Sequence, residues 1–129
     1  LEAVIEKLAL KDISCVHLRA EDAGQNKDHR EKYDLVTARA VARLSVLSEY
    51  CLPLVKVGGY FIAMKGSKFK EEIFVGNTAV GILGGEIISA EEVKLPGLDD
   101  GRAIIRIRKI KKTPVKYPRK AGLPEKQPL

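Results

Sequence analysis

The strongest constraint on the fold of this chain is an alternation of short β-rich runs with polar or helical stretches. The β-rich runs are Ile13–Leu18, Tyr33–Ala38 and Tyr60–Met64. Alternating strands and helices predict parallel strands joined by right-handed crossovers. Tyr60–Met64 is almost entirely apolar, which is typical of a parallel strand covered on both faces. The pattern therefore predicts an α/β fold built on a mostly parallel sheet.

The stretches between these runs carry helix and turn signals. Arg19–Lys32 is polar and is predicted to be a loop with room for one helical turn. Val41–Val55 has apolar residues at helical spacing and predicts a helix that ends near its proline. Gly58–Gly59 predicts a turn before the third strand. Ser67 is placed to cap a further helix, which runs to about Leu83 and ends at a pair of glycines.

Two β-rich segments, Glu86–Leu95 and Arg102–Ile110, close the folded part of the chain. The connector Pro96–Gly101 holds proline, glycine and aspartate, which favour a tight reversal. The pair is therefore predicted to form a β-hairpin, which adds one antiparallel strand to an otherwise parallel sheet. This ending resembles that of class I methyltransferases and differs from that of nicotinamide-binding Rossmann domains.

Positive charge is concentrated towards the C-terminus of the chain. The net charge is +6, and Arg102–Lys120 holds nine basic residues and no acidic one. Such a block suits a polyanion such as RNA, although a solvated segment that aids solubility is the alternative. Four of the six prolines lie in residues 111–129. We therefore expect a domain over residues 1–110 and an extended basic tail over 111–129, without helix or inner strand.

Several classes of protein are disfavoured by the sequence. No apolar run approaches the roughly 20 residues that a membrane helix needs. Cys15 and Cys51 lack the spacing of a metal site and are expected to be reduced, buried thiols of a cytosolic protein. His17 and His29 have no partner at metal or catalytic spacing, so no metal is expected. The chain begins at Leu1 without an initiator methionine, which leads us to expect a preceding segment.

Three polar clusters follow the predicted strands. They are Arg19–Asp22, Thr37–Arg43 and Lys65–Ser67. Ligands of open parallel sheets bind outside the carboxyl ends of the strands. The three clusters are therefore expected to share one edge of the sheet and to form a site there.

Four segments together resemble the GidB/RsmG family of bacterial 16S rRNA methyltransferases. They are Arg19–Glu21, Tyr33–Ala40, Lys65–Gly66 and Thr113–Pro124, and they occur in the family's order over essentially the whole chain. The resemblance implies a Rossmann-like class I fold that lacks its N-terminal part here. It also implies the cofactor S-adenosylmethionine and methylation of nitrogen 7 of one guanine in the decoding region of 16S rRNA.

The resemblance assigns cofactor contacts to Ala20 and Glu21, beside the adenine, and to Arg39. For Glu21 the alternative is a solvated loop carboxylate. For Arg39 it is a structural ion pair with Asp34 or Glu49. The family's glycine-rich cofactor loop and its acidic ribose-binding neighbour have no counterpart here, and we expect both upstream of the first residue. The chain alone is therefore expected to be inactive.

RNA contacts are predicted at the strand ends and in the tail. Lys65 ends an apolar strand, where a charge is costly unless it is paired or faces a cleft, and extension to water is the alternative. Arg43 is predicted to share a helical face with Arg39. The tail offers basic groups for phosphates and an aromatic ring for stacking on a base, although packing across the protein body is the alternative. The predicted contacts in the tail are Lys116, Tyr117, Arg119 and Lys120.

No catalytic proton-transfer residue is predicted. Nitrogen 7 of guanine carries a free lone pair, so catalysis reduces to orienting nucleophile, methyl group and sulfur. The expected partner is 16S rRNA or the small ribosomal subunit, and the expected setting is a monomer in the cytoplasm without membrane contact. Two alternatives remain open: an RNA-binding remnant without catalysis, and another Rossmann-type enzyme such as a nicotinamide-dependent oxidoreductase.

Overall fold

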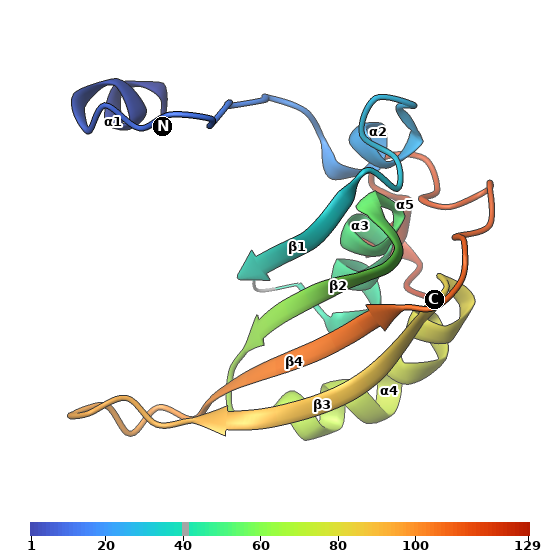
Figure 1. Cartoon of the computed structure of the whole chain (residues 1–129). Helices are drawn as coiled ribbons and strands as arrows, with labels where there is room; N and C mark the ends of the chain where they lie inside the picture. Colours follow the sequence, from blue (N-terminus) through green and yellow to red (C-terminus); the bar gives the residue numbers. More distant parts are fainter. Residues whose placement is uncertain (40–41) are drawn as a thin grey trace.

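The computed structural model describes residues 1–39 and 42–129 and holds a four-stranded mixed sheet in the order β1-β2-β4-β3 (Figure 1). β1 and β2 pair in parallel, whereas β4 is antiparallel to both β2 and β3. Three strands therefore run in one direction and β4 opposes them, which confirms the predicted α/β fold and its terminal hairpin. The strands are β1 (Tyr33–Arg39), β2 (Val55–Lys65), β3 (Gly85–Val93) and β4 (Arg102–Lys109).

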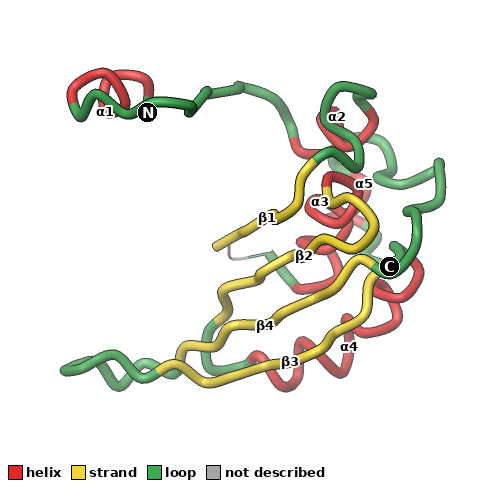
Figure 2. The backbone as a smooth tube through the Cα atoms, viewed as in Figure 1, coloured by secondary structure: helices red, strands yellow, loops and turns green. Residues whose placement is uncertain are grey.

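Helices cover one face of this sheet (Figure 2). They are α3 (Leu44–Cys51), followed by the 3-10 turn η1 (Leu52–Leu54), and α4 (Phe69–Ile82). Phe61 on β2 and Ile107 on β4 are fully buried against them. Of the described elements, none covers the opposite face, where Tyr60 is 38% exposed. The sheet was predicted to be covered on both faces, but the described helices cover only one of them.

The predicted strand Ile13–Leu18 is wrong for this structure. These residues have no strand geometry, and the described sheet begins at β1. A strand exists only when a neighbouring strand accepts its backbone hydrogen bonds, and an apolar run does not reveal whether that neighbour is present. α1 (Glu2–Lys7) lies away from the sheet on an extended segment and buries none of its residues (Figure 1).

Local differences from the prediction surround β2. α3 is shorter than the predicted Val41–Val55 helix, whose first residue lies outside the described residues. Gly58–Gly59 lies inside β2 and makes no separate turn. The β1–β2 pairing changes register there, because Tyr33 is opposite Val55 and Leu35 is opposite Tyr60. Gly58, with φ of +89°, supplies the left-handed backbone that this irregularity needs.

The C-terminal end of α4 was predicted correctly, whereas its N-cap was not. Ser67 does not cap the helix, because the N-cap position is Lys68 and no side chain caps it. Ser67 instead packs against Gly101 in the β3–β4 connector. A Cβ atom added at Gly101 would lie 2.9 Å from the Cβ of Ser67. The C-terminal end agrees with the prediction, since the helix stops at Ile82 and Gly84 follows with φ of +93°.

Two short helices form outside the longer predicted helices. α2 (Ala20–Gln25) lies in the segment predicted to be a loop with room for one helical turn, and α5 (Leu123–Lys126) lies in the tail, where no helix was predicted. The tail prediction is therefore wrong about helix, because Pro124 sits in the first turn, where no backbone N–H is required. The tail is also not solvated throughout, since Thr113 and Tyr117 are 3% and 7% exposed.

Candidate functional site

A hollow of about 750 Å³ lies at the carboxyl ends of β1 and β2, beside the connector between β3 and β4. Arg39 enters it from the end of β1 and faces Met64 in the parallel register. This is the edge at which open sheets of this kind bind ligands. We call it the edge hollow, and its lining residues are Arg39, Met64, Lys65, Gly66, Val93, Asp100, Arg102, Ala103 and Ile104.

The rim of the edge hollow is charged. Arg39 is exposed, and neither alternative partner takes it, because Asp34 pairs with Lys56 and Glu49 pairs with Arg119. A guanidinium that neither carboxylate engages can donate paired hydrogen bonds to a carboxylate or phosphate.

An ion pair between Asp100 in the connector and Arg102 at the start of β4 also borders the edge hollow. It was not predicted, because Asp100 was read only as a turn residue and Arg102 only as part of the basic block. Arg102 donates from Nε to Oδ2 of Asp100 at 3.0 Å and forms an ion pair from Nη2 at 2.9 Å. The hydrogen bond from Arg102 lowers the pKa of Asp100, so this carboxylate is ionised at neutral pH. The edge hollow thus holds both signs of charge beside the apolar side chains of Met64 and Ile104.

Lys65 borders the edge hollow, but its ammonium is used inside the molecule. Nζ lies 2.8 Å from Oε1 of Glu72 and donates to the carbonyl of Ala42 at 2.6 Å. The same Glu72 oxygen accepts the backbone N–H of Leu44 at 3.2 Å. Lys65 therefore ties the start of α3 to α4. The predicted phosphate contact is not supported, because the charge is already paired and the side chain is 5% exposed.

Arg43 does not share a helical face with Arg39. Arg39 ends β1, whereas Arg43 is the N-cap residue of α3, so no common helix links them. Arg43 is exposed beside Glu71 and Glu72 of α4. The spacing argument fails because the chain changes from strand to helix between the two arginines.

Ala20 and Glu21 are not brought to the edge hollow. α2 packs against α3 and against η1, which precedes the amino end of β2. The Glu21 side chain is almost fully buried, and its Oε1 accepts the backbone N–H of Gly122 at 3.1 Å. Two of the three predicted polar clusters therefore meet at one edge. The third does not, because the strand that was to deliver it does not form.

Of the four RNA contacts predicted in the tail, two are exposed and two are engaged within the protein. Lys116 and Lys120 are exposed. Tyr117 is 7% exposed, so its ring packs in the protein and is not presented for stacking on a base. Arg119 forms paired hydrogen bonds from Nε and Nη2 to the fully buried Glu49, at 3.0 and 2.8 Å. For Tyr117 and Arg119 the packing alternative is therefore the one that the structure supports.

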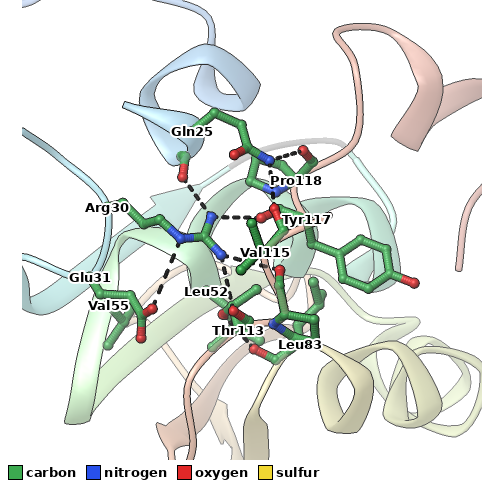
Figure 3. Close-up of polar contacts among 12 residues, drawn as sticks. Gln25, Arg30, Glu31, Leu52, Val55, Leu83, Thr113, Val115, Tyr117 and Pro118 are labelled. Atoms are coloured by element: carbon green, nitrogen blue, oxygen red, sulfur yellow. Dashed lines mark hydrogen bonds and ion pairs between the residues drawn. The ribbon is translucent and has the colours of Figure 1, made fainter. Parts of the chain in front are cut away.

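Polar contacts between distant segments, outside the edge hollow, were not predicted from the sequence. Arg30 and Gln25 donate hydrogen bonds to backbone carbonyls of the tail (Figure 3). The fully buried Lys109 donates to the carbonyls of Leu52 and Val55. Burial lowers the pKa of Lys109 to about 8. The partners of these groups lie 54 to 93 residues away in the sequence, so no local pattern reveals them.

Neither a metal site nor a membrane span is found in residues 1–39 and 42–129. No group of three or more His, Cys, Asp or Glu side chains in these ranges is arranged to hold a metal ion. None of the helices there has the length and apolar character that a membrane crossing requires. Burial raises the pKa of Cys51 to about 12, so this thiol is protonated at neutral pH.

The family of the chain is shown by a match to a family model. The family model of GidB, described as rRNA small subunit methyltransferase G, matches residues 1–98. The chain belongs to the GidB family. The resemblance stated from the sequence motifs is thereby confirmed.

Curated relatives of this GidB-family chain carry the name ribosomal RNA small subunit methyltransferase G. The protein from Lactobacillus acidophilus is 59% identical over 129 residues, and that from Lactobacillus johnsonii is 57% identical. A more distant relative, from Desulforamulus reducens, is 52% identical. Each alignment covers 100% of this chain and 54% of the relative, so the chain spans about half the length of the curated relatives it matches.

Solved structures give a weaker comparison. The T. thermophilus 16S rRNA methyltransferase RsmC matches 66% of this chain and 22% of its own, with a TM-score of 0.44 and 17% identity. A likeness of this strength supports no conclusion about the site. The relationship rests on the family match and the curated relatives.

Proposed function

We propose that the protein carrying this chain transfers a methyl group from S-adenosylmethionine to nitrogen 7 of a guanine in 16S rRNA. The observation that carries the proposal is the GidB family match over residues 1–98, together with relatives named as rRNA methyltransferases. The edge hollow adds physical support, because it lies where α/β enzymes of this architecture bind their ligands.

The residues of this chain fit the cofactor in part. Arg39 suits the carboxylate of the methionine moiety, because it is exposed at the carboxyl edge and is not engaged by Asp34 or Glu49. Ala20 keeps the proposed adenine contact on the strength of the family motif alone, because the structure does not bring the start of α2 to the edge hollow. The Glu21 carboxylate does not fit that role, because Gly122 and Arg19 already occupy it at 3.1 and 3.7 Å.

Methyl transfer to guanine nitrogen 7 mainly requires that the base and the methyl donor are correctly oriented. When bound, the cofactor would supply a methyl group on a positively charged sulfur, and that sulfur would depart as a neutral thioether as its bond to the methyl group is replaced by one to guanine nitrogen 7. The lone pair of nitrogen 7 is already free, so no proton would have to leave the base. The chain therefore needs no general base. Its contribution is to hold the guanine in the edge hollow against the neighbouring apolar side chains of Met64 and Ile104, which reduces the entropic part of the barrier.

The RNA side of the proposal uses exposed cations. Lys116 and Lys120 in the tail and Arg43 at the start of α3 are exposed and suit phosphate contacts. Lys65, Tyr117 and Arg119 are removed from the direct contacts, because each is buried or paired within the protein. The proposed setting is a cytoplasmic monomer that acts on the small ribosomal subunit or its RNA. The 129-residue chain alone is proposed to be inactive, because it has no counterpart of the family's glycine-rich cofactor loop.

Methyl transfer by the full-length protein tests this proposal. The protein is incubated with methyl-labelled S-adenosylmethionine and small subunits from a strain that lacks the homologous enzyme. The RNA is then digested to nucleosides for mass spectrometry. We expect label in 7-methylguanosine, strongly reduced in Arg39→Gln. Arg106→Gln, which removes an exposed charge from β4, serves as the matched control. RNA binding without transfer supports the remnant alternative, and label in another nucleoside contradicts nitrogen 7 as the acceptor.

A further inference from the structure

A second polar centre lies away from the edge hollow and fastens the tail to the body of the protein. Arg30, in the loop between α2 and β1, is 17% exposed. Its Nη1 donates to the carbonyls of Gly24 and Tyr117 at 2.8 and 2.6 Å. Its Nη2 donates to the carbonyls of Thr113 and Pro114 at 3.0 and 3.2 Å (Figure 3). One guanidinium thus satisfies three carbonyls of the tail and one of α2.

The neighbouring residues of α2 complete this contact. Gln25 donates from Nε2 to the carbonyls of Val115 and Pro118 at 3.2 and 2.8 Å. Pro118 is fully buried, and a Cβ on Gly24 would lie only 2.7 Å from its Cγ. The tail backbone therefore lies directly on α2. We call Gln25 and Arg30, with the tail carbonyls that they bind, the tail clamp.

The tail clamp fixes a backbone from which lysines project. Lys112, Lys116 and Lys120 are exposed and alternate with the buried Thr113 and Tyr117. A flexible basic tail loses conformational freedom when it meets RNA, and that loss weakens binding. A tail whose carbonyls are bound by Arg30 and Gln25 has already lost part of that freedom in the free protein.

We propose that Arg30 is a positioning residue for RNA binding, which holds residues 113–118 so that Lys116 and Lys120 meet RNA phosphates in a fixed arrangement. The inference rests on the proposed function. Arg30 touches neither RNA nor cofactor in this account. Its four hydrogen bonds go to backbone carbonyls, and it acts only through the two lysines.

Two variants of the full-length protein test the proposal by different routes. Arg30→Gln replaces the guanidinium by a shorter, neutral amide that cannot bind four carbonyls at once, whereas Gly24→Ala pushes Pro118 away without changing any charge. For both we expect the KM for small-subunit RNA to rise roughly ten-fold, because the backbone that carries the two lysines must then be ordered on binding. We expect kcat and the Kd for S-adenosylmethionine to stay unchanged. Arg106→Gln controls for the loss of one positive charge.

Combining the variants separates positioning from general destabilisation. In a Lys116→Ala/Lys120→Ala background, Arg30→Gln is expected to change the KM by less than about two-fold, since residues that act through one another are not additive. Hydrogen exchange at the Tyr117 and Arg119 amides is expected to speed up in Arg30→Gln and in Gly24→Ala. A full ten-fold effect in the double-lysine background overturns the inference, because Arg30 would then act by another route.

The failures of the two proposals can be told apart. Wild-type protein that neither binds nor methylates the RNA overturns the proposed function and the inference with it. Wild-type activity with an unchanged KM in Gly24→Ala, despite faster exchange at Tyr117, overturns the inference alone.

Discussion

The apolar N-terminal segment of the chain is mostly exposed, whereas the basic, proline-rich C-terminal tail is partly buried, which is the reverse of what their compositions suggest. Seven of the eight large apolar side chains between Leu1 and Leu18 are at least 44% exposed, Leu1 itself is 92% exposed, and only Ile5 is half-buried. The basic, proline-rich tail buries Tyr117, Pro118 and Pro124. Burial here follows the presence of a partner and not the apolar content of the segment.

The partners of the tail are specific polar groups. Glu49 is fully buried and accepts three hydrogen bonds from Arg119, one of them from the backbone N–H at 2.8 Å. Glu21 accepts the N–H of Gly122. A buried backbone N–H group needs a hydrogen-bond acceptor, and the Glu49 and Glu21 carboxylates supply one for the tail, as a neighbouring strand does in a sheet. Residues 13–18 form no such pairing with the described sheet, which begins at β1.

Removing Arg119 gives the largest expected effect. Arg119→Ala leaves the Glu49 carboxylate buried without its counter-charge, and we expect the free energy of unfolding to fall by about 4 kcal/mol. Urea unfolding of the 129-residue chain measures it. Lys120→Ala, one residue away and exposed, is the control and is expected to cost less than about 0.5 kcal/mol. Equal losses in the two variants contradict a seated tail.

Removing the buried ring of the tail comes next. Tyr117→Ala creates a cavity at a side chain that is 7% exposed. We expect it to lower the free energy of unfolding by about 3 kcal/mol. Val115→Ala, at a position that is 84% exposed, is the matched control and is expected to have almost no effect. If both substitutions were neutral, the ring would not belong to the core.

The buried lysine at the end of β4 gives a smaller, pH-dependent effect. The pKa of Lys109 is about 8 in the folded protein, against 10.5 for an unburied lysine. Between these values the unfolded chain binds the proton more tightly, so the free energy of unfolding rises as pH increases. We expect this rise in urea titrations across that range, and a shallower slope in Lys109→Met. Parallel slopes for the two proteins contradict the lowered pKa.

The N-terminal segment gives the smallest expected effect. Ile13 is 53% exposed, so Ile13→Ala in the 129-residue chain should change the free energy of unfolding by less than about 0.5 kcal/mol. A loss above about 2 kcal/mol in the same urea assay indicates a buried contact that the structure lacks.

Features set by local sequence were predicted well. The glycine pair that ends α4 and the hairpin around Pro96–Gly101 follow from backbone preferences of the residues themselves. Arg39 at the sheet edge follows from the alternation of strands and helices. These signals lie within a few residues of the structure that they specify.

Features set by distant partners were not predictable. Lys65 was expected to face RNA, but its charge is taken by Glu72 on the following helix. Arg119 and Glu49 are 70 residues apart, and no periodicity marks them as a pair. The strand predicted at Ile13–Leu18 failed for the same reason, because β-rich composition does not specify a neighbour.

Hydrogen exchange of the backbone amides in the 129-residue chain tests the comparison between the two ends most directly. The amides of Tyr117, Arg119 and Gly122 have acceptors in Pro114, Glu49 and Glu21, so we expect them to exchange slowly. We expect residues 13–18 to exchange at the rate of an unstructured chain. Equal protection at the two ends, or rapid exchange at Arg119 and Gly122, contradicts the account of the tail as an integral part of the fold.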